Sequence, residues 1–312
     1  MPLPPVVLDP PFNILRISHI ELNVTDLAAS KKFYCDTLGL AVTDETNNRL
    51  YLRAMEERSH HCVILVKADK PSVAAMAYRV WAEDDLDKAE SWFKSKGHKV
   101  EWVERAYQGR TLRTHDNAGM PIELHHAMDR LPSIHQQYAQ YKGVKPLRID
   151  HFNCFSTNVD EATTFYHEMG FRTTEYTADE ETGALWAAWL HRKGGVHDQA
   201  FTNGRGPRLH HVAFGCRTRL PFLICWTSWP PPAMSQTLSA APVATAFQTH
   251  SFCISPIPTA TALRSIAPTI KPSTQTTSRS TGTSKTHNAK LSGVHPRQKA
   301  GSKTAACLKG WK

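Results

Sequence analysis

The C-terminal part of this 312-residue chain lacks acidic side chains. From Leu223 to Lys312 the sequence has ten Lys or Arg and no Asp or Glu, which accounts for the formal charge of +9. The first 222 residues hold 27 basic and 28 acidic side chains, out of 37 and 28 in the whole chain. Because electrostatic binding of nucleic acid needs a basic surface, we expect no nucleic-acid partner for this near-neutral body.

The body also has few cysteines and no long apolar run. Its four cysteines are Cys35, Cys62, Cys154 and Cys216, and no two form a CxxC pair. This pattern argues against a secreted disulfide framework and favours reduced thiols in the cytoplasm. The start, MPLPPVVLDPPFN, lacks the basic and apolar regions of a signal peptide. No segment approaches the ~20 apolar residues that span a bilayer, so we expect a cytoplasmic protein without a membrane partner.

What the body does contain is an internal repeat. The segment RISHIELNVTDLAASKKFYCDTLGL, from residue 16, parallels RIDHFNCFSTNVDEATTFYHEMGF, from residue 148, and His19 and His151 are 132 positions apart. Each copy begins with an alternating, strand-like stretch, and a helical stretch follows that ends at a glycine. A second half of each copy begins at MAYRVW and at LHHVAF, where Arg79 and His211 are again 132 apart.

These halves predict an α+β fold of paired βαβββ modules in two domains. We expect a lead-in over 1–13, a structural N-terminal domain over 14–141 and a catalytic C-terminal domain over 142–222. The fourth module is then incomplete, and 223–312 is a disordered basic tail.

Three histidines of the second copy are candidates for chemistry: His151 in RIDHFN, His211 in PRLHHVAF and His197 in HRKGGVHD. The repeat places His151 and His211 at equivalent strand starts and so brings them together. Two imidazoles and one carboxylate leave open positions on a divalent metal, an arrangement suited to Fe(II) and O2. A single histidine at a strand start is, however, more often a hydrogen-bonded polar residue than a ligand.

The first copy has His19, Arg79 and Glu123 at the corresponding positions, and a guanidinium has no lone pair for a metal. We therefore expect a structural role there, with His19 and Glu123 pairing with Arg79. The remaining candidates are expected to be strand-end or loop histidines and core aromatics: His60, His61, His125 and His126, and Trp92, Trp186 and Trp189, of which Trp189 could line a ring-shaped pocket.

The stretches RIDHFN, LWAAWLHRKGGVHD and GPRLHHVAF, with AMAYRV and YLRAMEERSHH, make the chain similar to a known family over about Ile14 to Phe222. It resembles the extradiol catechol dioxygenases of the vicinal-oxygen-chelate superfamily, most closely those that cleave 3,4-dihydroxyphenylacetate. The resemblance implies Fe(II), with Mn(II) possible on the same ligands, O2 and a small aromatic diol as partners, a muconic semialdehyde as product, and a homotetramer.

The resemblance also implies residue roles. His151 and His211 are the metal ligands, His197 is the acid–base histidine, and Asn153 and Trp189 line the substrate pocket. The family's third ligand is a Glu near the end of module four. This sequence has no acidic residue after Asp198, so the chain as it stands is expected to have little or no activity.

The tail has the pattern of a shifted reading frame. If each codon takes the third base of one residue's codon and two of the next, SAAPVATAF (239–247) permits Gly-Gly-Pro-Gly-Arg-His-Gly-Val, and SPIPTATALRSI (255–266) permits a segment ending in Glu-Ile-Tyr. The frame then slips between Phe222 and Leu223. The alternatives are another enzyme of the superfamily, such as a glyoxalase-like one, and a non-catalytic protein with a genuine basic tail.

Overall fold

The computed structural model of the chain describes residues 3–194, 197–216 and 251–255, and the predicted tail and frame slip lie outside these ranges apart from one short strand. Two mixed β-sheets with a few helices form the described part, in agreement with the expected α+β class. The predicted domain boundaries stay predictions. None of the helices in the described ranges is long and apolar enough to cross a membrane.

The first sheet contains the first two βαβββ modules. Its strands follow the order β2-β3-β4-β1-β5-β8-β7-β6. The first module comprises β1 (Ile14–Val24), α1 (Leu27–Lys31), the π-helix η1 (Lys32–Leu38), β2 (Ala41–Glu45), β3 (Arg49–Arg53) and β4 (Val63–Lys67). The second comprises β5 (Ser72–Val80), α2 (Asp84–Ser95), β6 (Glu101–Val103), β7 (Thr111–His115) and β8 (Pro121–His125). The two modules meet where β1 pairs with β5.

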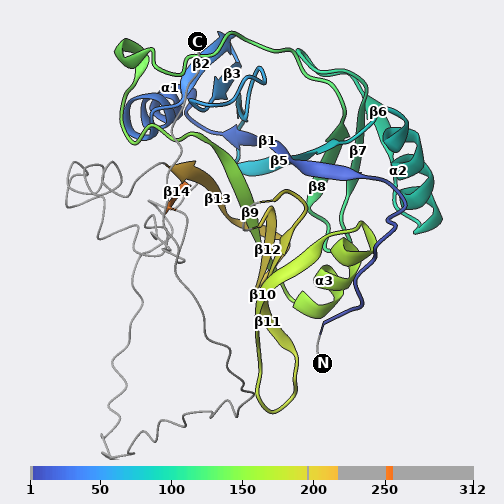
Figure 1. Ribbon diagram of the computed structural model, residues 1–312. Helices are drawn as coiled ribbons and strands as arrows, with labels where there is room; N and C mark the ends of the chain where they lie inside the picture. The colour runs from blue at the N-terminus through green and yellow to red at the C-terminus, as the bar shows by residue number, and fades with distance from the viewer. Residues whose placement is uncertain (1–2, 195–196, 217–250, 256–312) are drawn as a thin grey trace, which may run out of the picture. The chain divides into compact units, whose positions relative to one another are not determined.

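The second sheet repeats this plan in the order β10-β11-β12-β9-β13-β14, after a short 3₁₀ helix η2 (Tyr138–Gln140). Its elements are β9 (Arg148–Ser156), α3 (Val159–Glu168), β10 (Arg172–Ala178), β11 (Leu185–His191), β12 (Gln199–Asn203), β13 (Arg208–Cys216) and β14 (Ser251–Ser255). Figure 1 shows α3 next to the strands of this sheet, in which β9 lies between β12 and β13. The third module is complete, and β13 begins the fourth.

Local signals explain the helix ends. The Asp26 carboxylate accepts the N–H of Ala29 at 2.8 Å, and Asn158 accepts that of Glu161 at 3.0 Å, so each helix begins with a side-chain cap. Gly39 and Gly170 end the helical stretches with φ of 90° and 84°. A side chain is disfavoured at such left-handed positions, which is why glycine occurs there.

The core lies on and between these elements. The central strand β1 is buried along most of its length, and Tyr78, Phe152 and Tyr166 are fully buried large side chains. Helices α2 and α3 contact each other through aromatic rings, with Trp92 and Phe165 centroids 5.4 Å apart. Burial of this apolar area provides most of the stabilisation and holds the strands that bear the site.

The strand register corrects one predicted equivalence. His151 lies opposite Ala213, and His211 lies opposite Asn153. In the first sheet His19 lies opposite Ala77, and Glu21 lies opposite Ala75. The position that corresponds to His211 is therefore Ala75, 136 residues earlier, and the prediction of Arg79 was wrong. The reason is that the second copy has four additional residues before β12. Val63 of β4 pairs with Ile20, and Gln199 of β12 pairs with Phe152. The distance between equivalent residues of the two copies therefore grows by four at β4 and β12.

The strand beside β13 differs from its counterpart. β8 runs parallel to β5, whereas β14 runs antiparallel to β13. The described part of module four therefore does not reproduce the pairing of module two. If module four repeated module two, its third metal ligand would lie on a strand parallel to β13, as β8 is parallel to β5.

Candidate metal centre

Two histidines on neighbouring strands face each other. His151 on β9 and His211 on β13 have their Nε2 atoms 3.2 Å apart, with ring planes at 74°. Both side chains are buried, at 4% and 7% exposure. Two ligands at about 2.1 Å from one ion and at a right angle have nitrogens about 3.0 Å apart, so this separation suits adjacent positions on a metal.

Side chains behind the two rings orient them. Nδ1 of His151 lies 2.9 Å from an Asp150 carboxylate oxygen, and Nδ1 of His211 lies 2.7 Å from Nδ1 of His210. A carboxylate that accepts the Nδ1–H of an imidazole leaves the lone pair on Nε2. The Asp150 contact therefore directs the free lone pair of His151 toward His211.

His197 lies beside this pair. Its ring centroid is 4.0 Å from that of His151, and its side chain is 3% exposed. It belongs to the connection between β11 and β12, of which 195–196 are outside the described residues. The structure thus brings together all three histidines that the sequence singled out.

Burial determines the charge of these rings. It lowers the pKa of His151 and His197 to about 3 and that of His211 to about 2, since an imidazolium loses its hydration there. Charge repulsion would lower the pKa values further: the Lys193 ammonium acts on His151 and His197, and protonation of His151 would disfavour that of His197 and His211. At neutral pH all three rings are uncharged, as a metal ligand or proton acceptor requires.

Asn153 and Trp189 lie in one row with His211 across four strands. Trp189 on β11 is opposite Ala200 on β12, Ala200 is beside Asn153 on β9, and Asn153 is opposite His211 on β13. Residues that pair directly across strands project on the same face of a sheet. The two predicted pocket residues therefore share the face of the histidine pair, although Trp189 is two strands away from β9.

The described residues supply two ligands for a metal, not three. Within 3–194, 197–216 and 251–255 no three His, Cys, Asp or Glu side chains are arranged to hold an ion. The sequence contains no acidic residue after Asp198. The imidazoles thus fit a divalent metal, while the carboxylate of a two-His, one-carboxylate site is absent from the described part.

The first sheet shows a different arrangement from the predicted one. Glu123 is fully buried and pairs with Arg105 and with Arg113 (3.3 Å), whereas Arg79 donates to the His126 carbonyl at 2.9 Å. The expected pairing of Glu123 with Arg79 was wrong, because Arg79 lies at the exposed end of β5.

The histidines of the first sheet form a buried cluster. His125 and His19 both contact the Ser18 hydroxyl, at 2.7 Å and 3.3 Å, and the ring of His61 lies 4.8 Å from that of His19. His60, His61 and His125 are all buried, and His125 ends β8, as a strand-end histidine was expected to do. Among the tryptophans, Trp186 is 58% exposed, so its predicted place in the core was also wrong.

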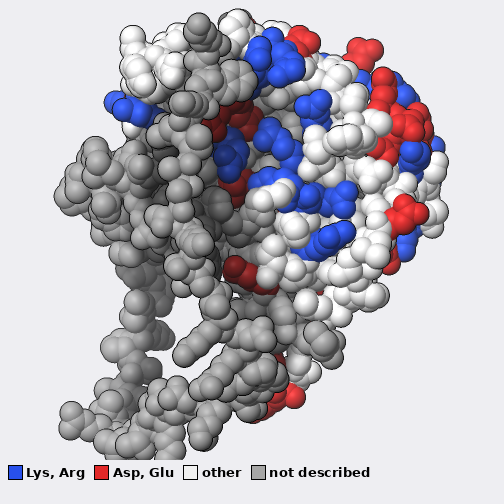
Figure 2. Space-filling view, in the orientation of Figure 1, with Lys and Arg blue, Asp and Glu red and all other residues white. Residues whose placement is uncertain are grey.

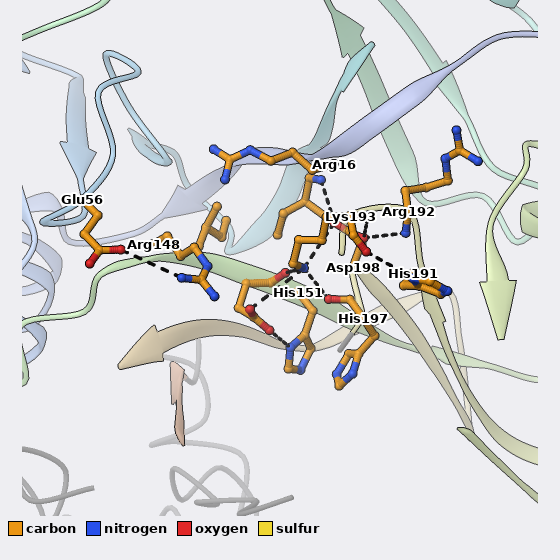
Figure 3. A network of polar contacts seen from close by, with 12 residues as sticks. Arg16, Glu56, Arg148, His151, His191, Arg192, Lys193, His197 and Asp198 are labelled. Carbon is orange, nitrogen blue, oxygen red and sulfur yellow. Dashed lines mark hydrogen bonds and ion pairs between the residues drawn. The ribbon is translucent and has the colours of Figure 1, made fainter. Parts of the chain in front are cut away.

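Sequence reasoning missed Lys193 and Asp198. Figure 3 shows them in a network beside His151 and His197. The Asp198 carboxylate is fully buried and accepts the N–H groups of Ile17 (3.1 Å), Arg192 (2.7 Å) and Lys193 (3.0 Å). Both residues belong to the same HRKGGVHD segment as His197. A lysine and an aspartate close to a candidate histidine were the signal that the sequence offered, since such charges pair when they are buried.

Figure 2 shows both charge signs on the viewed face, with acidic side chains gathered over α2. The first turn of α2 contains Asp84, Asp85 and Asp87, which is favourable near a helix N-terminus. This distribution agrees with the near-neutral body expected from the composition.

Comparison with known proteins shows what the chain is similar to. The family model described as "Glyoxalase/Bleomycin resistance protein/Dioxygenase superfamily" matches residues 16–124 and 148–250. A manganese-dependent 2,3-dihydroxybiphenyl 1,2-dioxygenase of Geobacillus genomosp. 3 is 28% identical over 216 residues, 64% of this chain and 68% of that protein. A metapyrocatechase of Pseudomonas sp. (strain CF600) is 27% identical over 218 residues, 66% and 71% of the two chains.

Solved structures agree. Homoprotocatechuate 2,3-dioxygenase from Brevibacterium fuscum, in complex with 3,4-dihydroxyphenylacetate, is 37% identical with a TM-score of 0.69, covering 78% of this chain and 75% of that one. The enzyme from Arthrobacter globiformis is 34% identical with the same TM-score and coverage.

Proposed function

Because the chain belongs to the Glyoxalase/Bleomycin resistance protein/Dioxygenase superfamily, and within it to the extradiol ring-cleaving dioxygenases, we propose that its site is built to cleave 3,4-dihydroxyphenylacetate. The ring opens at the carbon–carbon bond beside the two hydroxyls. One atom of O2 becomes the aldehyde oxygen of the muconic semialdehyde, and the other enters the new carboxylate, while both catechol oxygens stay in the product. The observation that supports this most strongly is the His151–His211 pair, with Nε2 atoms 3.2 Å apart on the face that bears Asn153 and Trp189. The acetate side chain of the proposed substrate follows the likeness to the homoprotocatechuate enzymes.

In this proposal His151 and His211 hold the metal, which is Fe(II). Mn(II) is the competing ion, because the same ligands suit both and one relative is named as manganese-dependent. When bound, such a cation would make the catechol hydroxyls more acidic and bring the diol and O2 together. Both imidazoles are neutral, so they bind a cation without first losing a proton.

The neighbouring residues act on the substrate itself. His197 is a neutral imidazole with one N–H and one lone pair. It is placed to accept a proton from a catechol hydroxyl and to return it to an oxygen of the opening ring. Asn153 would hydrogen-bond a substrate oxygen, and the Trp189 ring would pack against the aromatic face. Burial of the three histidines keeps bulk water away from these steps.

We propose that the missing Glu is encoded in a shifted frame after Phe222. With two imidazoles and no carboxylate, the present chain would bind Fe(II) weakly and turn over slowly. The absence of acidic residues from 199 to 312 and the antiparallel β14 both support a fourth module that does not match its repeat.

Oxygen consumption by two clones tests the proposal. One expresses the present chain and the other restores the frame after Phe222; both are loaded with Fe(II) and given 3,4-dihydroxyphenylacetate. We expect a yellow product and oxygen uptake from the restored clone, with activity at least a hundredfold lower for the present chain. A restored clone that consumes no oxygen with any catechol would overturn the proposal and favour a glyoxalase-like activity. Resequencing the DNA and transcript across the codons for Phe214–Pro230 tests the frame separately.

We further propose that the protein is a cytoplasmic homotetramer. Cys35, Cys62 and Cys154 form no disulfide in the described part of the chain, which suits a reducing compartment. The exposed Trp186 and Tyr176, on adjacent strands β11 and β10, provide apolar area for subunit contacts. Light scattering on the eluted protein measures the mass, and a monomer at micromolar concentration would contradict this assignment.

A further inference from the structure

One lysine connects strand β9, which bears His151, with the β11–β12 connection, which bears His197. The Lys193 ammonium donates to the backbone carbonyl of Asp150 at 2.7 Å and to that of His197 at 2.5 Å. It also lies 3.3 Å from an Asp198 carboxylate oxygen. An ammonium group has three N–H donors, so these three acceptors use all of them.

The environment of this cation is closed. The Lys193 side chain is 14% exposed, and its partner Asp198 is fully buried. Ordering a lysine side chain costs conformational entropy. Short, charge-assisted hydrogen bonds to three fixed acceptors offset that cost.

Each acceptor belongs to the candidate site or adjoins it. Asp150 precedes His151 on β9, and its carboxylate lies 2.9 Å from the His151 ring nitrogen Nδ1. His197 directly precedes the backbone hydrogen bonds of the sheet. The Asp198 N–H donates to the Leu190 carbonyl at 2.8 Å, and the Asp198 carbonyl accepts from the Phe152 N–H at 3.0 Å. The regular strand pairing therefore ends next to His197. Lys193 binds the carbonyl of His197 itself, just outside the paired segment.

The network also reaches the first sheet. The Asp198 oxygen beside the lysine accepts the N–H of Ile17 on β1 at 3.1 Å, across 181 positions. Figure 3 shows Lys193 beside His151 and His197, with dashed contacts that include those to His197 and Asp198. The ammonium is thus held against the body of the protein and is not a freely rotating side chain.

We propose that Lys193 is a positioning residue that sets the distance between the His151 and His197 rings by binding the carbonyls of Asp150 and His197. This inference rests on the proposed function for its catalytic meaning, but the positioning itself is a property of the metal-free protein. Without the ammonium, the β11–β12 connection separates from β9. The His197 ring then loses its place beside His151, and His151 loses its support through Asp150.

The matched control is Arg192. It is in the same connection, and its guanidinium also binds backbone carbonyls, those of Ile14 (2.8 Å) and Gly170 (2.5 Å). These lie away from the histidine pair. Lys193→Met and Arg192→Met each remove one cation from the connection, and only the first removes the contacts to Asp150 and His197. Lys193→Arg keeps a cation and donors at the position.

The test uses the metal-free full-length chain and diethyl pyrocarbonate, with carbethoxylation of each histidine followed by mass spectrometry. We expect Lys193→Met to raise the rates at His197 and His151 about tenfold, with the buried His61 of the first sheet unchanged as internal reference. Arg192→Met should stay within twofold of wild type and Lys193→Arg within threefold. A Lys193→Met variant with wild-type rates, or an equal rise in Arg192→Met, would overturn the proposal. If Lys193→Met does not fold, as judged by the His61 rate, the same comparison is made with Lys193→Gln.

A Mn(II) titration by calorimetry gives the second readout. Outer partners of a ligand histidine typically affect metal affinity by 10–100-fold. We expect a loss in that range for Lys193→Met and less than threefold for Arg192→Met. If the wild-type chain binds Mn(II) too weakly to be titrated, the carbethoxylation rates alone decide the role of Lys193.

Discussion

Ala200 in the second sheet lies at the position that Ile64 fills in the first. Ala200 is between Trp189 and Asn153 in its row of strands, and Ile64 is between Tyr51 and Glu21 in the corresponding row. The methyl group of alanine fills less of the space between the tryptophan and the asparagine than the branched side chain of isoleucine would. The difference coincides with the sheet that has the histidine pair.

We therefore expect Ala200→Ile to exclude the catechol. In the frame-restored enzyme, the KM for 3,4-dihydroxyphenylacetate should rise at least tenfold, while Ala200→Gly should stay near wild type. Overpacking a tight site costs typically 1–3 kcal/mol, so thermal unfolding must be measured alongside to separate exclusion from instability. A stable Ala200→Ile enzyme with wild-type KM would show that the ring binds elsewhere.

Replacing either candidate ligand should abolish metal binding. In the frame-restored enzyme, His151→Ala and His211→Ala each leave a single imidazole, and we expect the Mn(II) or Fe(II) bound per chain to fall from near one to near zero. His19, which corresponds to His151 in the first sheet, provides the matched control, and His19→Ala should leave the stoichiometry unchanged. Metal analysis after desalting measures it. Equal loss in all three variants would mean that unfolding, not ligation, is responsible.

The first-sheet histidines predict acid sensitivity. Burial lowers the pKa of His61 to about 3 and that of His125 to about 4. In the unfolded chain both titrate near 6.5. The unfolded state therefore binds more protons below pH 6.5, and the stability present above that pH is lost as the pH falls toward 4.

Between pH 6.5 and its pKa in the folded protein, each such histidine lowers the free energy of unfolding by about 1.4 kcal/mol for each pH unit. We expect His61→Gln to reduce the loss of unfolding free energy between pH 6.5 and pH 4.5, measured by urea denaturation. The exposed His135 provides a control, since His135→Gln should leave the slope unchanged. An unaltered slope in His61→Gln would show that this ring is already protonated in the folded protein.

Asp116 should change the free energy of unfolding with pH in the direction opposite to His61 and His125. Burial raises the pKa of its carboxyl to about 6, although the N–H groups of Ala118 and Met120 donate to it at 3.0 Å and 2.8 Å. The folded state therefore holds a proton that the unfolded state releases near pH 4. This contribution to stability is present below that pH and is lost as the pH rises through 6.

Asp116→Asn keeps an acceptor for both N–H groups without a charge. We expect it to raise the unfolding free energy by about 1–3 kcal/mol at pH 7.5 and by little at pH 4. Urea denaturation at the two pH values makes the comparison. A variant destabilised equally at both would indicate that the contact of Tyr166 with the second carboxylate oxygen outweighs the charge.

Much of the fold was predictable because the repeat is written in local patterns. Alternating strands, capped helices and terminal glycines follow from short-range chemistry, and they recur in both copies. The proximity of His151 and His211 also followed, since the repeat places them on paired strands. The roles of these residues and the domain boundaries stay predictions.

Register and long-range pairing were not predictable in the same way. Four additional residues before β12 shift the second half of the copy, so Ala75, not Arg79, corresponds to His211. Matching letters at a constant offset cannot detect an insertion that leaves both motifs intact. The pairing of Glu123 with Arg105 likewise depends on which side chains the packed sheet brings within reach.

By itself, the sequence determined the modules, the chemical nature of the candidate ligands and the absence of any acidic residue after Asp198. These depend only on composition and on periodicities of two to four residues along the chain. The tertiary structure alone decided that Lys193 joins Asp150 and His197, and that Trp189, Ala200, Asn153 and His211 share one row. The reason is physical: such contacts join residues on different strands, and their geometry is set by the register and packing of the whole sheet.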